Sequence, residues 1–149
     1  MKKYRVCVYA ICKNEEKFVD RWFNSMKEAD EIYVLDTGST DNSIKLLKEK
    51  GVHVKQKKIN PWRFDVARNI SLDMVPNNAD ICVCTDLDEV FLKGWREKLE
   101  SVWNKETNRC RYTYNWSLDE NDNPKVSFIY EKIHSRNNYK WINPVHEVL

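Results

Sequence analysis

The stretch Ile81-Cys82-Val83-Cys84-Thr85-Asp86-Leu87-Asp88-Glu89 joins an apolar, β-branched run to three carboxylates. Such a run is typical of a buried strand, and its abrupt end predicts that Asp86, Asp88 and Glu89 lie where the strand leaves the core. Carboxylate oxygens are the ligands that Mg²⁺ or Mn²⁺ takes in proteins, usually together with waters and substrate phosphates. The stretch therefore predicts a divalent-cation site at a strand end, for a phosphate-bearing ligand.

The chain before this stretch alternates between short apolar runs and amphipathic segments. Strands are expected at 4–11, 32–35 and 52–54, because these runs are rich in β-branched and aromatic residues. Between them, helical spacing predicts three helices. The first has an apolar stripe of Phe18, Val19, Trp22, Phe23 and Met26; the second spans 44–50 and ends before Gly51; the third has Pro61 in its first turn and a core stripe of Val66, Ala67, Ile70 and Met74.

After the carboxylates, one more helix is expected at 93–103, with Trp95, Leu99, Val102 and Trp103 on its apolar face. Two strands, 109–118 and 125–134, follow around a turn-forming segment, and a short last strand is expected at 139–142. The sequence thus predicts an α/β fold, with a mostly parallel sheet flanked by helices and antiparallel strands added near the C-terminus.

Polar sequences follow three of the predicted parallel strands: Lys13-Asn14-Glu15, the loop 36–41, and the segment 86–89. In open α/β sheets, ligands bind beyond the carboxyl ends of the strands. These three segments are therefore expected to line one cleft.

The length predicts a single domain over residues 1–149, and the balanced charge argues against nucleic-acid binding. The chain has 42% apolar and 32% charged residues, with 25 Lys and Arg against 23 Asp and Glu. The run 55–58, which holds three lysines, is interpreted as a solvated strand end. No signal peptide or spanning segment is recognised, so a cytoplasmic protein, at most peripheral to the inner face of the membrane, is expected. The five cysteines form no C-x-x-C pair and are expected to be reduced thiols.

Two other enzyme classes share short motifs with this chain. Asp36-Thr37-Gly38-Ser39 resembles the D-T-G-S of aspartic proteases, but no second D-T-G is present and the flanking segments have helical spacing. Asp86-Leu87-Asp88-Glu89-Val90 resembles the motif of haloacid-dehalogenase-type phosphatases, with Asp86 as nucleophile and Asp88 as acid/base. The phosphatase stays an alternative, although the chain after Val90 is too short for the later motifs of that class.

A resemblance over the full chain points elsewhere. It rests on residues 10–16, 29–43, Ala67-Arg68-Asn69, Asp86-Leu87-Asp88-Glu89 and Val145-His146-Glu147, which occur in the order seen in glycosyltransferase family 2. The chain resembles bacterial members that glycosylate lipopolysaccharide core or related polysaccharide. The resemblance implies a GT-A fold, a nucleotide-sugar donor and a Mn²⁺ or Mg²⁺ ion on the D-x-D motif.

The resemblance also implies roles for individual residues. The donor is expected to contact Ile11, Lys13, Asn14, Glu15, Asp36, Thr37, Arg68, Asp86, Leu87 and Asp88. Asp88, Asp86 and His146 are the expected metal ligands, and Arg68 offers a fixed fork of donors to a diphosphate. Many family members have a second Asp in place of Thr37, a residue that helps to hold the base; a UDP-sugar is the favoured donor. Glu147 and Glu89 are the candidates for the general base of an inverting reaction.

The sequence therefore predicts metal-dependent transfer of a sugar to a glycan, lipid-linked or protein acceptor. A phosphatase and a nucleotide-sugar-binding module without turnover remain the alternatives. Trp62, Trp116 and Trp141 are candidates for stacking on sugar rings. Because few residues follow the His-Glu pair, the chain is interpreted as the catalytic segment of a longer protein or as a protein that completes its acceptor site by assembly, as a homo-oligomer or at a membrane surface.

Overall fold

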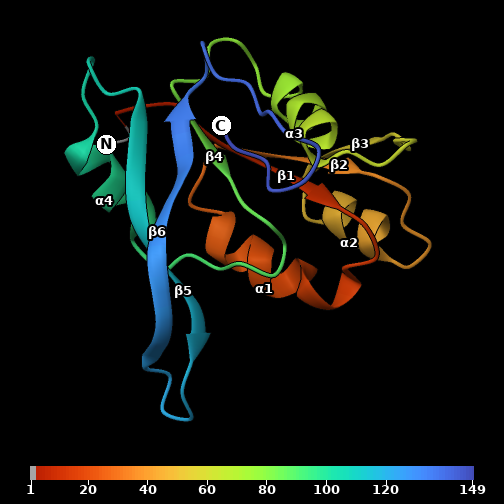
Figure 1. Cartoon of the computed structure of the whole chain (residues 1–149), viewed down its shortest axis with the longest axis horizontal. Coiled ribbons are helices and arrows are strands. Elements are labelled where there is room, and N and C mark those ends of the chain that lie inside the picture. Colours follow the sequence, from red (N-terminus) through yellow and green to blue (C-terminus); the bar gives the residue numbers. More distant parts are fainter. Residues whose placement is uncertain (1–2) are drawn as a thin grey trace.

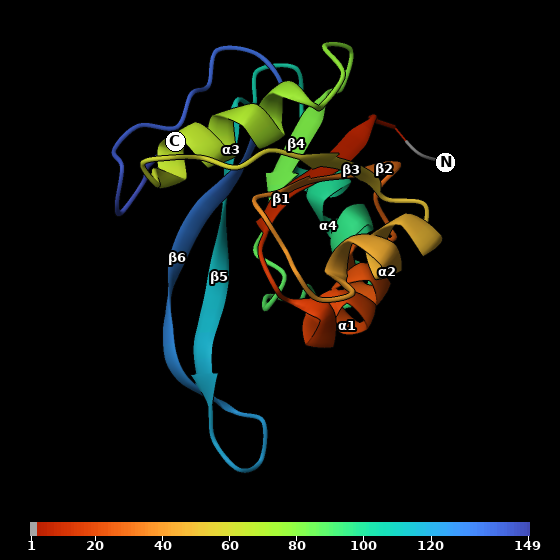
Figure 2. The ribbon, with the colours of Figure 1, turned by 90° about the vertical axis from the view of Figure 1, so that its right-hand side faces the viewer.

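The central strand β1 (Val6–Cys12) is buried on both sides, and its alternate residues belong to two different cores. Val6, Val8 and Ala10 pack with one hydrophobic cluster, while Cys7 and Tyr9 pack with another. Successive side chains of a strand point to opposite faces of the sheet, so two layers must cover β1. The computed structural model describes residues 3–149, and Figures 1 and 2 show helices on both faces of the sheet.

The elements alternate as the sequence predicts. After β1 come α1 (Glu16–Met26), β2 (Glu31–Asp36), α2 (Ser43–Glu49), β3 (His53–Gln56), α3 (Phe64–Asp73), β4 (Ile81–Cys84), α4 (Trp95–Val102), β5 (Arg109–Leu118) and β6 (Pro124–Ser135). Figure 2 shows α3 on one face of the sheet and α1, α2 and α4 on the other.

The six strands lie in the order β3-β2-β1-β4-β6-β5. The first four are parallel, and β6 pairs antiparallel with both β4 and β5. This confirms the predicted α/β class with antiparallel strands near the C-terminus. The order reverses between β1 and β4, so the loops that follow these strands diverge and leave space at their carboxyl ends.

Helix α3 differs from the prediction in its start and in its buried face. It begins at Phe64, because Arg63 is still extended; Pro61 follows a cis peptide bond and lies outside the helix. The predicted stripe of Val66, Ile70 and Met74 is only half-buried; the fully buried positions include Ala67, Arg68, Ser71 and Leu72. The helix turns this way because Arg68 finds two carboxylate partners inside the protein.

The predicted last strand over 139–142 is replaced by irregular backbone with one isolated bridge between Ile142 and Val148. Side-chain hydrogen bonds hold this segment instead. The Trp141 indole donates to the Tyr9 hydroxyl, the Trp141 N–H donates to the Asn69 side-chain oxygen, and the Trp141 carbonyl accepts from the Asn69 side-chain nitrogen. In α4, Val102 was expected in the core and is exposed. All five cysteines are free, as predicted, and four are buried. No helix in residues 3–149 is long and apolar enough to cross a membrane.

Candidate active site

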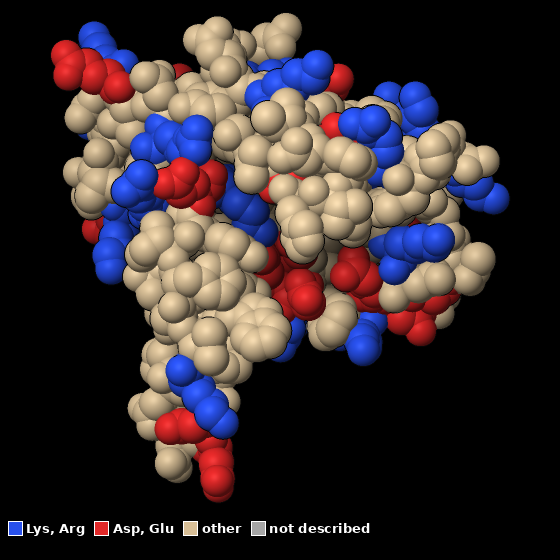
Figure 3. Space-filling view, viewed as in Figure 1, with Lys and Arg blue, Asp and Glu red and all other residues tan. Residues whose placement is uncertain are grey.

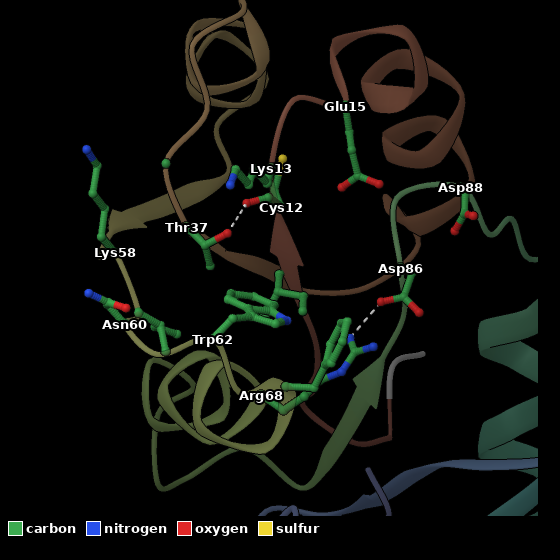
Figure 4. Close-up of a pocket in the computed structure, with 14 residues that line it drawn as sticks. Cys12, Lys13, Glu15, Thr37, Lys58, Asn60, Trp62, Arg68, Asp86 and Asp88 are labelled. Atoms are coloured by element: carbon green, nitrogen blue, oxygen red, sulfur yellow. Dashed lines mark hydrogen bonds and ion pairs between the residues drawn. The ribbon is translucent and has the colours of Figure 1, made fainter. Parts of the chain in front are cut away.

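A cleft of about 890 Å³ opens at the carboxyl ends of β1, β2 and β4 (Figure 4). Seven of the ten residues predicted to contact a donor line it: Ile11, Lys13, Glu15, Thr37, Arg68, Asp86 and Asp88. The three strand-end segments therefore meet, as expected for a parallel sheet at its switch point. The other three predicted residues, Asn14, Asp36 and Leu87, do not line the cleft.

Asn14 and its neighbours join the loop after β1 to the loop after β2. Asn14 has a left-handed backbone (φ 55°), and its side-chain oxygen accepts a hydrogen bond from the Thr40 backbone N–H at 2.7 Å. The Ser39 hydroxyl accepts one from the Asn14 N–H at 2.8 Å, and the Ser43 hydroxyl accepts one from the Glu15 N–H at 2.9 Å. Asn14 thus fixes the shape of the cleft wall, and Lys13 and Glu15 on either side of it line the cleft.

Asp36 is fully buried and holds the loop after β2 through hydrogen bonds to its backbone. Its Oδ1 accepts hydrogen bonds from the N–H groups of Gly38 and Ser39, both at 3.0 Å, and Gly38 has the positive φ (123°) that favours glycine there. Within residues 3–149, its Oδ2 has no hydrogen-bond partner. Thr37, whose hydroxyl donates to the Cys12 carbonyl at 3.2 Å, presents this loop to the cleft. Leu87 lies in the hydrophobic core.

Arg68 is the buried cation of the site. Its Nη1 lies 2.7 Å from Asp86 Oδ1, and its Nε donates to Glu147 Oε1 at 3.1 Å. The guanidinium also lies 5.6 Å from the centre of the Trp141 ring. A planar guanidinium can hold two carboxylates in fixed directions. Arg68 therefore joins the D-x-D motif to the last residues of the chain.

Lys132, on β6, holds the same motif from the other side. Its Nζ lies 2.8 Å from Glu89 Oε1 and 3.4 Å from Asp86 Oδ2, and Glu89 also accepts a hydrogen bond from the Asp86 N–H at 3.1 Å. Burial alone would raise the pKa of the Asp86 carboxyl, but Arg68 and Lys132 outweigh it and lower that pKa below its usual value. For Glu89 burial dominates, and its pKa is raised although Lys132 opposes the shift.

Three carboxylates gather at one end of the cleft, where Figure 4 shows Glu15, Asp86 and Asp88 around the same space. Burial, followed by the charges of Asp88 and Asp86, raises the pKa of Glu15 to about 7. The Asp88 side chain is exposed, and it forms no ion pair or hydrogen bond with the described residues. Because Asp86 is paired with Arg68 and Lys132, the unneutralised negative charge at this end of the cleft lies chiefly on Asp88.

The donor set fits a hard divalent ion only in part. Asp88 and Asp86 offer oxygens, but in residues 3–149 no group of three or more His, Cys, Asp or Glu side chains is placed to hold a metal. Mg²⁺ and Mn²⁺ sites commonly complete their shell with waters and phosphate oxygens, so two carboxylates are sufficient for such a site. The structure does not bring His146 to this cluster: its side chain is exposed, its φ is 53°, and it does not line the cleft.

The sequence did not identify two parts of the site: most of the wall at 58–64, and Lys132. The segment 58–64 supplies one wall through Lys58, Asn60, Trp62 and Phe64. Of these, only Trp62 was a candidate site residue, and the helix expected from Pro61 begins at Phe64. Of the three tryptophans, Trp62 lines the cleft, Trp116 is exposed on the hairpin, and Trp141 is buried. Lys132 did leave a signal, because period-two alternation places it on the same strand face as the aromatic residues Phe128 and Tyr130. The alternation marks the face on which Lys132 lies but does not indicate which carboxylates it meets.

The fold and the cleft together define an α/β protein of the kind that binds phosphate-bearing ligands at the switch point of a parallel sheet. The family follows from comparison with known proteins. A model of the family described as "Glycosyl transferase family 2" matches residues 7–147, and the chain belongs to that family.

Individual relatives agree with this assignment. An uncharacterized glycosyltransferase of Rickettsia bellii (strain RML369-C) is 29% identical over 109 residues, which are 72% of this chain and 35% of that protein. The chain thus spans about a third of the length of this relative. A mannosyltransferase of Pyrobaculum calidifontis, solved with GDP-Man and Mn²⁺, has a TM-score of 0.58 at 18% identity. The match covers 71% of this chain and 34% of the mannosyltransferase. This likeness confirms the GT-A fold.

The glucosyl-3-phosphoglycerate synthase of Mycobacterium tuberculosis, solved with UDP, has a TM-score of 0.50 at 25% identity. The match covers 59% of this chain and 35% of the synthase. These two solved relatives hold different nucleotides, so the choice of base varies among proteins that share this fold.

Proposed function

We propose that this chain is the catalytic segment of a metal-dependent transferase, which moves a sugar from a nucleotide-sugar donor, with UDP-sugars favoured, to a hydroxyl acceptor with inversion. One observation carries the proposal: the carboxylates of Asp86 and Asp88 share a cleft with Arg68, Lys13 and Thr37 at the strand ends. Family membership supports the reaction class. The domain is proposed to be a single unit over residues 1–149.

Within the cleft, the donor is proposed to lie with its base and ribose near Thr37 and its diphosphate near Arg68. Lys13 and Lys58 add positive charge to the same wall. Asp86 is already neutralised by two cations, whereas Asp88 is not paired to any described residue, so Asp88 is the stronger candidate for direct metal ligation. When bound, the ion supplies neutralisation of the charge that grows on the departing diphosphate.

Inverting transfer breaks the bond between the sugar and the diphosphate while the acceptor oxygen forms a bond on the opposite face. The acceptor proton must pass to a base. Both candidates are ion-paired, Glu89 to Lys132 and Glu147 to Arg68. We favour Glu89, because burial raises the pKa of its carboxyl and it lies between the D-x-D motif and β6. Glu147 is ion-paired to Arg68 and is better placed to orient that guanidinium. Glu89→Gln is expected to abolish transfer with donor affinity retained, and Glu147→Gln is expected to weaken donor binding.

Thermal unfolding with added nucleotides tests the proposal. UDP, UDP-sugars and GDP-sugars are each added with Mn²⁺ or with a chelator. A ligand at one hundred times its Kd stabilises the fold by about 2.7 kcal/mol, which is roughly 5–10 °C for a domain of this size. We expect that shift with UDP and UDP-sugars, and only with Mn²⁺.

Three other results would overturn or redirect the proposal. If no nucleotide stabilises the fold in the presence of Mn²⁺, the transferase proposal fails. Trapping of a phosphoaspartate at Asp86 would instead support the phosphatase. Nucleotide binding without transfer or hydrolysis across a panel of acceptors would support a binding module.

A further inference from the structure

The hairpin of β5 and β6 extends well beyond the rest of the sheet (Figures 1 and 2). One face of the hairpin has a row of aromatic rings. The register pairs Tyr112 with Tyr130 and Tyr114 with Phe128. Opposite residues of an antiparallel pair share a face, so all four rings lie on the same side. The rings of Tyr114 and Tyr130 are stacked with centroids 4.5 Å apart, and the Phe128 ring meets Tyr130 edge-on at 5.0 Å. We call these four residues the aromatic row.

The aromatic row starts at the acidic end of the cleft. Lys132, the next residue on this face of β6, has its Nζ 4.6 Å from the centre of the Tyr130 ring and 2.8 Å from Glu89. At the other strand, Tyr112 contacts Phe91, which closely follows the D-x-D motif, with ring centroids 5.4 Å apart. Figure 3 shows uncharged side chains on the hairpin bordering the acidic side chains at the middle of this face. The row therefore runs from the reacting end of the cleft outward along the hairpin.

Core packing does not explain the outer three rings. Tyr112 packs against the main hydrophobic core, but Tyr114, Phe128 and Tyr130 belong to neither hydrophobic cluster of the described residues. Phe128 is 39% exposed, and the two tyrosines are half-buried. A group of aromatic rings that is partly exposed and continuous with a cleft is typical of a binding surface.

The chemistry of the row indicates the occupant. The C–H faces of a sugar ring pack against aromatic faces, which carry partial negative charge, and its hydroxyls can bond phenol groups at the rim. The hairpin also has charges of both signs, with Asp119, Glu120 and Asp122 near Lys125, so it lacks the basic face that favours anionic lipid. An acceptor must place one hydroxyl near the D-x-D motif while the rest of it extends away, which is the path that the row follows.

We propose that Tyr114, Phe128 and Tyr130 form a subsite for the carbohydrate portion of the acceptor, which stacks its sugar rings along the hairpin outward from Glu89 and Lys132. This inference rests on the proposed transferase function and specifies its acceptor as a saccharide rather than a protein side chain.

Binding to an array of defined bacterial oligosaccharides, in the presence of UDP and Mn²⁺, tests this subsite. Phe128→Ala and Tyr114→Ala are compared with Ile129→Ala. Ile129 is a matched control because it is 57% exposed and adjacent to Phe128, but strand alternation places it on the opposite face. We expect at least one oligosaccharide to bind the natural chain, with affinity reduced about tenfold or more in the two aromatic variants and changed less than about twofold in Ile129→Ala.

The UDP-dependent shift in Tm, measured on the same samples, separates this inference from the proposed function. If UDP binds but no oligosaccharide does, or if Ile129→Ala loses as much affinity as Phe128→Ala, the subsite is wrong and the transferase proposal stands. If UDP does not bind, the proposed function fails. Two further results would also overturn the subsite: a dimer in sedimentation that Phe128→Ala dissociates, and binding to phosphatidylglycerol vesicles that depends on Phe128.

Discussion

The parallel region of the sheet and the C-terminal region differ in how they use their side chains. In β1 every residue except Ile11 is buried, and β4 is buried throughout. In β5 no residue is fully buried, and the first nine residues of β6 are exposed or half-buried. The parallel region therefore holds the apolar core, which stabilises the fold, whereas the C-terminal region offers surface.

The two regions meet through ion pairs that cross between them. Arg68 and Asp86 belong to the parallel region, and their partners Glu147 and Lys132 come from the C-terminal region. Buried ion pairs contribute little net stability compared with apolar packing, but they fix which groups face each other. The comparison indicates that the C-terminal region completes the geometry of the site more than it stabilises the fold.

The largest expected difference between the regions concerns tryptophan. Trp22, in α1, is fully buried, and its indole donates to the Thr85 hydroxyl at 2.9 Å. Trp22→Ala should lower the free energy of unfolding by about 3–5 kcal/mol, because it leaves a large cavity and an unpaired hydroxyl. Trp116→Ala, on the exposed hairpin, should cost about 0.5 kcal/mol or less. Urea denaturation of both variants measures these free energies of unfolding. Equal losses of stability in the two variants would contradict the claim that the parallel region holds the core and the C-terminal region offers surface.

A slightly smaller effect is expected from His134, where β6 enters the core. Burial lowers the pKa of His134 to about 4 from 6.5, and its ring bonds the Tyr9 hydroxyl at 2.8 Å. Between these pKa values the unfolded chain binds a proton that the folded chain does not, so stability falls as pH decreases from about 6.5 to 4. The loss should be roughly 3 kcal/mol by pH 4.

Comparison with His134→Gln isolates this contribution, because the other titrating groups are common to both proteins. The stability difference between them should change by roughly 3 kcal/mol over that pH range, in urea denaturation at fixed ionic strength. A pH-independent difference would mean that His134 is not held neutral by the fold.

The third effect concerns Lys132. Lys132→Met removes the ammonium from Glu89 and Asp86 and should cost about 2 kcal/mol at pH 8, because a buried carboxylate then lacks its charged partner. At pH 5 the cost should be smaller, since Glu89, whose pKa is already raised, can take up a proton. Lys125→Met, at an exposed position on the same strand, is the control and should change stability by less than about 0.5 kcal/mol. A cost that does not decrease at low pH would argue against this ion pair.

The parallel region was largely predictable from sequence, because buried strands and amphipathic helices leave strong periodic signals. The runs that become β1, β2 and β4 are apolar and end at polar segments. These segments supply five of the predicted cleft residues: Lys13, Glu15, Thr37, Asp86 and Asp88. The buried face of α3 was not predictable in this way. Arg68 is buried because of Asp86 and Glu147, both distant in sequence, and periodicity counts arginine as a surface residue.

The C-terminal region was predicted as a hairpin, and Glu147 was a candidate site residue, but the ion pair of Glu147 with Arg68 and the role of Lys132 were not predicted. Lys132 and Glu147 reach the D-x-D motif only through pairing of β6 with β4 and through the contact of Trp141 with Asn69. Alternation along β6 marks the strand face on which Lys132 lies, but no local pattern identifies the distant partners of Lys132 or Glu147. In the segment 58–64, only Trp62 was a candidate site residue. Residues 58–63 form irregular backbone, although a helix was expected from Pro61, and irregular backbone leaves no periodic signal.

The central claim is that the exposed carboxylate of Asp88 provides the metal-dependent hold on a nucleotide. Titration calorimetry with UDP, with Mn²⁺ or with a chelator, tests it on the natural chain, on Asp88→Asn and on Asp73→Asn, an exposed control at the end of α3. We predict that UDP binds the natural chain and Asp73→Asn only when Mn²⁺ is present. Asp88→Asn should lose about tenfold or more in UDP affinity, which is at least about 1.4 kcal/mol. Its free energy of unfolding in urea should change by no more than about 0.5 kcal/mol. Equal UDP affinity in Asp88→Asn and the natural chain, or UDP binding that is indifferent to the chelator, would contradict the claim.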